Sequence, residues 1–203
     1  MRRALVVVVL GMLAGACSVG QGSGQIGGVV HDTLCGVEEA DYQLAPTFFS
    51  ADVVEDRGDG AGEISRRISM RIQRGSFREG DSDGLLVSVR DANAVARTSL
   101  GVPIDITGEP GAPVRLTLYL NQTCESGFPD EFWQIPLVIE AHGGTITFDA
   151  IYAPDLDTES TEINGTLTDV LFVDPARPAE RFALLSGSFR FFYQRGRPAQ
   201  LFP

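Results

Sequence analysis

Regular alternation of apolar and polar side chains is the pattern that most constrains the fold of this chain. It is clearest in residues 68–73, 85–90 and 114–120, where every second side chain is apolar. A β-strand turns successive side chains to opposite faces, so such a segment can bury one face and leave the other in water. Each of the three segments is therefore predicted to be a half-buried strand.

The second half of the chain continues this pattern. Residues 132–141 and 145–152 are rich in β-branched and aromatic side chains, and His142-Gly143-Gly144 lies between them. A Gly-Gly pair supplies the positive φ angles that tight hairpin turns need, so an antiparallel hairpin is predicted here. Two further strands are predicted over residues 163–173 and 182–194.

The fold class predicted from these segments is all-β. Residues 91–98 have the pattern of a short helix, with Asp91 as its N-cap. Elsewhere beyond the N-terminal region the chain favours about eight to ten short strands separated by turn residues. We expect a single antiparallel β-sandwich, with a β-barrel as the alternative. Phe48 and Phe49 are expected to fill its core.

Residues 1–16 have the parts of a secretory signal peptide. Arg2 and Arg3 form a positive start, an apolar run extends from Ala4 to Ala16, and small residues precede Cys17. The run is shorter than the about 20 apolar residues that a membrane-spanning helix needs. The pattern predicts export, with removal of the signal at its small-residue end.

The segment Leu13-Ala14-Gly15-Ala16-Cys17 resembles the lipobox of bacterial lipoproteins. The family usually has Leu three residues before Cys, whereas here Ala14 holds that place and Leu13 lies one residue further back. The resemblance covers the signal only. It implies diacylglyceration of the Cys17 thiol, cleavage just before it and acylation of the new amine. The alternative is an ordinary secretory signal cleaved near Ala16, which leaves a free cysteine.

The resemblance also implies a location. In Gram-negative lipoproteins a residue other than Asp after the lipidated Cys is the default for transfer to the outer membrane, and this chain has Ser18 there. We therefore expect a cell-envelope protein that is held in a membrane, most simply the outer membrane, by lipid on Cys17. More than one acyl chain gives stable membrane anchoring.

Composition separates a tether from a folded domain in the rest of the chain, and the net charge argues against a nucleic-acid partner. Residues 17–28 are interpreted as the lipidated Cys and a flexible Gly/Ser tether, and residues 29–203 as a single domain. The formal net charge is −11, and it becomes −13 without Arg2 and Arg3. An acidic domain repels phosphate backbones and anionic headgroups. We therefore expect no nucleic-acid partner, and a domain that stands off the membrane on its tether.

Cys35 and Cys124 are the two cysteines left after lipidation. In an exported protein such a pair predicts one disulfide, which stabilises a loop of this length by about 4 to 5 kcal/mol in the chain-entropy model. The alternative is two free thiols. Neither cysteine has the neighbours of a zinc site.

The sequence carries no recognisable catalytic constellation. His31 and His142 are its two histidines, and the adjacent His31 and Asp32 would point to opposite faces of a strand. Gly80-Asp81-Ser82-Asp83-Gly84 has the G-x-S-x-G spacing of a nucleophile elbow, but this stretch is interpreted as a turn. We predict a protein that is not an enzyme and has no cofactor or metal site.

Three acidic loops, at residues 56–63, 81–84 and 155–162, could supply oxygen ligands to calcium. None has the full spacing of a calcium-binding loop, and Asp and Gly are also the commonest turn residues. We interpret all three as turns, and calcium binding is left open as an alternative.

Phe128, Phe132 and Trp133 form a candidate ligand patch near Cys124. Aromatic rings beside acidic side chains can stack on sugars, although core residues that flank a loop have the same pattern. Together, these features predict an anchored lipoprotein with a non-catalytic β-sandwich and a structural or protein-interaction role in the cell envelope, with envelope proteins or glycans as partners. The alternative is a ligand-binding module for carbohydrate, with or without calcium.

Overall fold

The structure is a computed structural model, and it describes residues 21–33, 35–57, 64–75, 82–124, 138–157 and 161–193. These residues form strands and one short helix, in the following order: β1 (Gly22–Asp32), β2 (Val37–Gln43), β3 (Phe48–Arg57), β4 (Ile64–Gln73), β5 (Gly84–Val89), α1 (Ala92–Thr98), β6 (Ile104–Asp105), β7 (Val114–Tyr119), β8 (Val138–Ala150), β9 (Glu162–Val173) and β10 (Arg181–Phe192).

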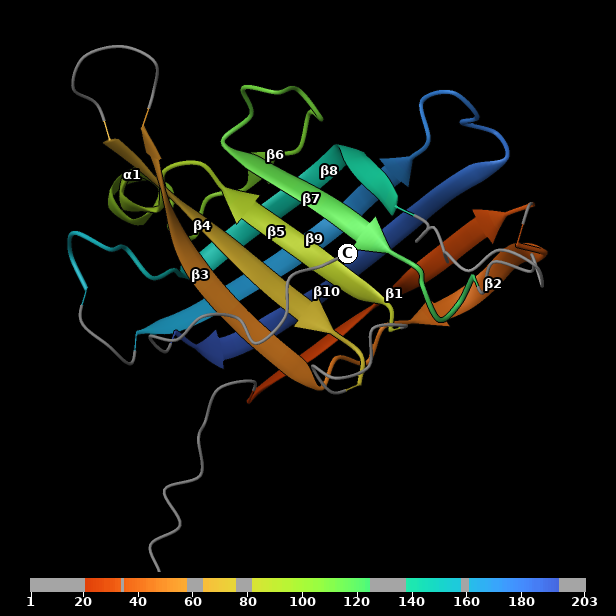
Figure 1. Ribbon diagram of the computed structural model, residues 1–203, viewed down its shortest axis with the longest axis horizontal. Coiled ribbons are helices and arrows are strands. Elements are labelled where there is room, and N and C mark those ends of the chain that lie inside the picture. Colours follow the sequence, from red (N-terminus) through yellow and green to blue (C-terminus); the bar gives the residue numbers. More distant parts are fainter. Residues whose placement is uncertain are drawn as a thin grey trace, which may run out of the picture.

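All strands belong to one antiparallel sheet (Figure 1). The strand order is β2-β1-β10-β9-β8-β7-β5-β4-β3, and β6 pairs with β8 outside this path. Strands from β3 to β10 follow one another as a meander, and β1 then pairs with β10. The two edge strands, β2 and β3, are consecutive in the chain and are joined by residues 44–47.

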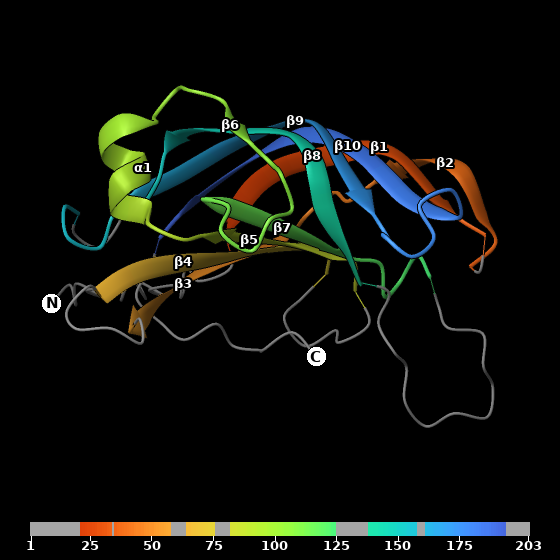
Figure 2. The same cartoon turned by 90° about the horizontal axis from the view of Figure 1, so that it is seen from above.

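The sheet folds over on itself to give two layers (Figure 2). β1, β9 and β10 lie in one layer, β3, β4, β5 and β7 lie in the other, and β8 passes between the two. Within the described part of the chain, β2 and β3 each pair with a single neighbour, so the sheet does not close into a barrel. The predicted all-β, sandwich-like fold is confirmed. The layers are halves of one continuous sheet rather than two separate sheets.

One apolar core fills the space between the layers. It extends from Ile26 in β1 to Tyr193 after β10, and Phe49, Phe148 and Phe172 are among its largest buried side chains. The predicted strands at 68–73, 85–90 and 114–120 correspond to parts of β4, β5 and β7, and their apolar positions face this core. Alternation predicted these strands correctly, because a shift of one residue would turn their apolar side chains from the core to the solvent.

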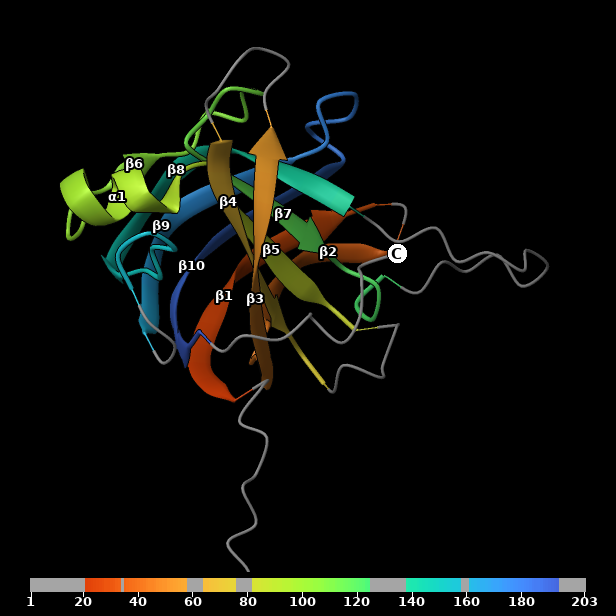
Figure 3. The same cartoon turned by 60° about the vertical axis from the view of Figure 1, so that its left-hand side comes forward.

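The predicted short helix is present as α1, at the end of the sandwich where it contacts β4 (Figure 3). Asp91 is its N-cap and accepts a hydrogen bond of 2.9 Å from the backbone N–H of Ala94. The helix is too short to be stable alone, so burial of Ala92 and Val95 in the core must hold it in place. No helix among the described residues is long and apolar enough to cross a membrane.

The predicted hairpin at His142-Gly143-Gly144 is wrong. These residues lie inside β8, which continues from Val138 to Ala150. The pairing of β8 with β9 shifts register on both sides of Gly143, which marks β-bulges. Gly144 has a φ of 86°, and a Cβ on it would lie 2.3 Å from the carbonyl oxygen of Asp169. The glycines thus bend a long strand instead of reversing it, because a bulge needs the same backbone freedom as a turn.

The predicted tether is also wrong over most of its length. Residues 22–28 form the first part of β1, which pairs with β10 on one side and with β2 on the other. A Gly-rich segment can enter a sheet because ladder hydrogen bonds are made by the backbone alone. Gly28 has a φ of 152°, and a Cβ there would lie 2.1 Å from the carbonyl oxygen of Leu184. The segment is rich in glycine partly because neighbouring backbone comes so close.

Candidate functional site

Cys35 and Cys124 form the predicted disulfide, with their Cα atoms 5.2 Å apart. Cys35 follows β1 and Cys124 ends the turn after β7, so the bond joins the N-terminal strands to the middle of the chain. Asp32 lies beside it and accepts a hydrogen bond of 3.1 Å from the Cys35 backbone N–H. The bond spans 89 residues of sequence, a large loop to close in the unfolded chain.

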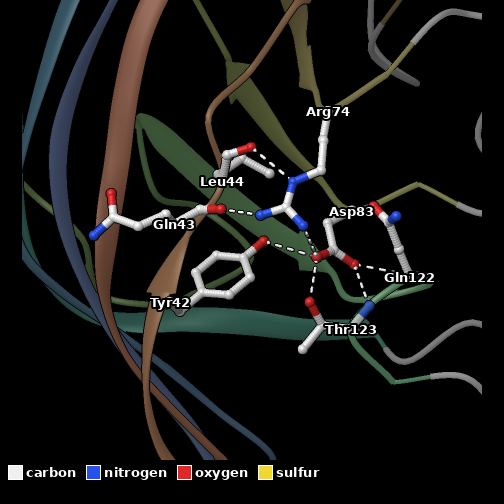
Figure 4. Close-up of polar contacts among 7 residues, drawn as sticks. All are labelled: Tyr42, Gln43, Leu44, Arg74, Asp83, Gln122 and Thr123. Carbon is white, nitrogen blue, oxygen red and sulfur yellow. Dashed lines mark hydrogen bonds and ion pairs between the residues drawn. The ribbon is translucent and has the colours of Figure 1, made fainter.

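A buried carboxylate, Asp83, organises the polar residues at the same end of the fold (Figure 4). Its oxygens accept hydrogen bonds from the Tyr42 hydroxyl at 3.2 Å and from the backbone N–H groups of Gln122 and Thr123 at 2.9 and 3.0 Å. The Thr123 hydroxyl donates a fourth hydrogen bond. The carboxylate therefore joins β2, the start of β5 and the turn that carries Cys124.

Arg74, just after β4, completes this network (Figure 4). Its guanidinium lies 3.8 Å from an Asp83 oxygen and 5.8 Å from the centre of the Tyr42 ring. It also donates hydrogen bonds to the carbonyl oxygens of Leu44, at 3.1 Å, and Gln43. Burial and the neighbouring Asp83 raise the pKa of Tyr42 well above its usual value, so its hydroxyl stays protonated and remains a donor.

The Asp83 network has the features of a structural clasp. Both carboxylate oxygens are occupied by donors of the chain itself, so calcium could bind Asp83 only after those bonds broke. The network also joins the edge strand β2 to Arg74 and Asp83, which lie between β4 and β5. β2 shares no ladder hydrogen bonds with β4 or β5 among the described residues. We therefore assign the network to stability rather than to ligand binding.

A groove on the outer face of β4, β5, β7 and β8 has different properties. Its volume is about 270 Å³, and four charged side chains line it: Arg67, Arg90, Arg115 and Glu140. These residues alternate with core side chains such as Ile68 and Val114, so they point away from the core. Three guanidinium groups and one carboxylate thus line the groove, in a chain whose net charge is −11.

Arg115 and Arg90 contact groups beside the groove. Arg115 donates two hydrogen bonds of 2.8 Å to the two carboxylate oxygens of Glu140, and about 45% of each side chain remains exposed. Arg90 donates to the carbonyl oxygens of Gly111 and Pro110, at 3.2 and 3.5 Å. Those carbonyls carry no full charge, so the positive charge of Arg90 is not cancelled by its partners.

The floor of the groove adds hydroxyl groups. Ser69, Ser88 and Thr117 line it, and Ser88 lies opposite Ser69 on β4 and Arg115 on β7 in the strand register. Hydroxyls can donate to or accept from a ligand, and guanidinium groups favour carboxylate and phosphate because their paired N–H groups match two oxygens. The groove can therefore hold a small anionic group together with neighbouring hydroxyls.

The two histidines, His31 and His142, do not lie in one site. His31 lies on β1 and stacks on Phe182, with ring centroids 5.1 Å apart. His142 lies on β8 and packs against the loop at Gly108. β10 and β9 separate the two strands, so strand spacing alone puts them about 14 Å apart. A catalytic or metal-binding pair of histidines is thus incompatible with the fold.

Among the described residues, the fold brings together one group of possible metal ligands, namely Asp32, Cys35 and Cys124. The two sulfur atoms are bonded to each other, and Asp32 forms an ion pair of 2.9 Å with Arg181. With the disulfide formed, the thiolates that a soft metal needs are not available. This arrangement does not fit a metal site in an oxidising compartment.

The remaining predicted sites are placed as follows. In the acidic loops, Asp155 pairs with Arg66 and Asn93, and Asp157 accepts a hydrogen bond of 2.8 Å from the Ala153 backbone N–H. These contacts fit the interpretation of that loop as a turn. The aromatic patch of Phe128, Phe132 and Trp133 and the lipidation site Cys17 lie outside the described residues.

Sequence reasoning missed the groove, because its arginines are far apart in the chain. Arg67, Arg90 and Arg115 belong to three different strands or strand ends, and each occupies an ordinary polar position of an alternating segment. Alternation does place each of these arginines on the water-facing side of its predicted strand. It does not show which strands are neighbours, and without the strand order the three side chains could not be assigned to one groove.

Comparison with known proteins finds no match. No protein-family model matches the chain, and neither a curated protein nor a solved structure resembles it significantly. The geometry described above is therefore the basis for any functional conclusion.

Proposed function

We propose that this chain is an exported lipoprotein, anchored by lipid on Cys17, whose domain binds an anionic saccharide of the cell envelope without catalysing a reaction. The observation that carries the binding role is the outer groove, where Arg67, Arg90 and Arg115 converge above a floor of hydroxyl groups. A carboxylate or phosphate on a sugar would engage the guanidinium groups, and sugar hydroxyls would engage Ser69, Ser88 and Thr117.

Export is supported by the disulfide. Bonds of this kind persist in oxidising compartments and are rare in the cytosol, so Cys35–Cys124 agrees with the signal-peptide pattern of residues 1–16. The acidic charge of the rest of the domain supports a selective groove, because an anionic ligand is repelled elsewhere on the surface. A structural or protein-interaction role in the envelope is the competing proposal.

Calorimetry with the full-length protein in detergent separates these roles. We expect oligogalacturonate, which carries a carboxylate on each sugar, to bind, and neutral maltooligosaccharides of equal length not to bind. Arg90→Gln and Arg115→Gln should each weaken oligogalacturonate binding severalfold. Arg97→Gln, which removes the same charge from the exposed end of α1, should leave binding unchanged.

Salt gives a second readout, because screening weakens contacts between exposed charges. Binding should weaken as ionic strength rises, and less steeply in the Arg90→Gln variant. Equal binding of charged and neutral sugars, or no binding of either, would reject the anionic-saccharide proposal and favour the protein-interaction role.

A further inference from the structure

The outer face of β1, β10 and β9 is apolar and poor in charge. Val29, Leu184 and Leu171 lie side by side across these strands in the register of the sheet, with exposures of 37%, 43% and 38%. Their chain neighbours Val30 and Ala183 are buried, so the three side chains point away from the core. We call the outward side of these three strands the neutral face.

A second row continues the neutral face. His31, Phe182 and Val173 are consecutive partners in the same register, and the rings of His31 and Phe182 stack. At the other end of β10, Phe192 is 53% exposed. Single exposed apolar side chains are common on protein surfaces. A run of them across three strands is typical of a surface that binds a protein, a ligand or a membrane.

The charges of these strands largely cancel. Arg190 pairs with Glu162, with a hydrogen bond of 2.9 Å, and Arg181 pairs with Asp32. Asp169 is the remaining charged residue of the three strands. The whole chain has a net charge of −11, so most of its acidic residues lie outside these three strands. On the edge strand β2, which pairs with β1, the exposed Asp41 lies opposite Val29 and limits the neutral face on that side. An anionic membrane would repel the other surfaces more strongly than this one.

The position of β1 limits how far the domain can move from a lipid on Cys17. The strand begins at Gly22, so residues 18–21 alone separate the lipidated residue from the sheet. Five Cα steps reach at most about 18 Å when fully extended. The domain is thus held against the bilayer, and the strand nearest to the attachment point belongs to the neutral face.

We propose that the neutral face of β1, β10 and β9 rests on the membrane that holds the protein's own lipid. The inference depends on the proposed anchoring at Cys17. A short link keeps the face at a high effective concentration next to its surface, so weak contacts are enough to keep it docked. Val29, Leu171 and Leu184 contact the boundary between headgroups and acyl chains, where apolar side chains bind favourably.

This orientation also places the groove. The groove opens on the outer side of β4, β5 and β7, which form the opposite layer of the sandwich (Figure 2). With the neutral face on the membrane, the arginines point away from the bilayer. They are then kept from the anionic headgroups of that membrane and are presented to ligands in the aqueous space.

The test uses the full-length lipidated protein in vesicles of phosphatidylethanolamine and phosphatidylglycerol. A fluorophore is attached to Ser188→Cys, on the neutral face, or to Val54→Cys, on β3 in the opposite layer. The new cysteine is the sole free thiol, because Cys17 is acylated and Cys35–Cys124 is bonded. We expect a nitroxide on the lipid headgroup to quench the Ser188 label severalfold more than the Val54 label.

Two matched variants test the face itself. Val29→Glu puts a charge on the neutral face and should remove the difference in quenching, whereas Val54→Glu makes the same change at a valine of similar exposure and should preserve it. In the Val54→Glu protein the second fluorophore is moved to Thr117→Cys, which lies on the same outer layer.

The outcomes separate the orientation from the anchor. Equal quenching of the two labels in a protein that floats with the vesicles would overturn the orientation and leave the anchor intact. Concentration-dependent energy transfer between Ser188 labels, without lipid quenching, would show that a second copy covers the face, and it would also overturn the proposal. Failure of the wild-type protein to float with vesicles, or to carry acyl groups in its mass spectrum, would instead reject the anchor.

Discussion

Asp83, the residue before β5, accepts a hydrogen bond of 3.0 Å from the backbone N–H of Thr123. Thr123 directly precedes the disulfide cysteine Cys124. The same turn is therefore secured twice, by a buried carboxylate and by a covalent bond. The disulfide connects the first strands of the chain to its middle, and the Asp83 network does so through the Tyr42 hydroxyl. Among the described residues, β2 shares no ladder hydrogen bonds with β5 or β7, so these links hold it to strands with which it does not pair.

The clasp predicts a large loss of stability when Asp83 is removed. Asp83→Ala leaves the Arg74 guanidinium and several buried donors without their acceptor. A buried donor left without its acceptor costs about 1 to 3 kcal/mol, so the loss of several should be large. The measurement is urea unfolding followed by circular dichroism. Asp149→Asn, at an exposed position of β8, is the control and should change the free energy of unfolding little.

Tyr42 predicts a pH dependence. Its pKa in the folded protein is raised above the ordinary value of 10.0, mainly by burial and then by Asp83. The folded state thus holds the phenol proton more tightly than the unfolded state does. The stabilisation is fully present below pH 10 and is lost as the pH rises above it, because only the unfolded state then gains by ionisation. Tyr42→Phe should make the unfolding midpoint fall less steeply above pH 10, and an unchanged slope would contradict this.

The two adjacent glycines of β8 predict different responses to alanine. A Cβ on Gly144 would lie 2.3 Å from the Asp169 carbonyl oxygen at a positive φ, whereas a Cβ on Gly143 would lie 3.6 Å from Leu171. Gly144→Ala should lower the free energy of unfolding by at least about 1 to 3 kcal/mol. Gly143→Ala should stay within about 0.5 kcal/mol of the wild type. Equal effects in thermal unfolding would show that the bulge is not held as described.

Reduction of the disulfide should destabilise the N-terminal strands first. The chain-entropy model gives about 4 to 5 kcal/mol for a loop of this length, an upper limit because unfolded chains retain structure. β2 is an edge strand, whereas β1 is paired on both sides. Mild proteolysis of the reduced protein should therefore cut first within or beside residues 37–43. First cleavage in β9 or β10 would be inconsistent with this order.

The lipid anchor predicts a change of partitioning. Cys17→Ser removes the thiol that would carry lipid. The variant should enter the aqueous phase in detergent extraction, and the wild-type protein should enter the detergent phase. Cys35→Ser is a control for thiol loss and should partition like the wild type, since Cys35 pairs with Cys124. Equal partitioning of the Cys17→Ser and wild-type proteins would show that this cysteine carries no lipid.

The alternating segments were sufficient to predict the strands and their buried sides. Residues 68–73, 85–90 and 114–120 each show which side chains face the core, because a shift of one residue would expose the whole apolar set. The cap at Asp91 and the pairing of Cys35 with Cys124 were also predictable, since one depends on local hydrogen bonding and the other on cysteine count.

Glycine-rich segments could not be predicted in the same way. Residues 22–28 have the composition of a linker and form a strand, and Gly143-Gly144 has the composition of a turn and forms a bulge. In both cases the backbone of another strand decides the outcome, through ladder hydrogen bonds and close approach. Composition describes what a glycine permits, and the neighbouring strand selects one of those conformations.

The sequence by itself determined the all-β class, the strands with strong alternation and the residues that face the core, because these depend on local periodicity and burial. Only the tertiary structure decided which strands are neighbours. That order brings Arg67, Arg90 and Arg115 into one groove, and it sets Val29 beside Leu184 and Leu171 on the opposite layer. Pairing between distant strands is selected by the packing of the whole core, so no short segment of the chain contains it.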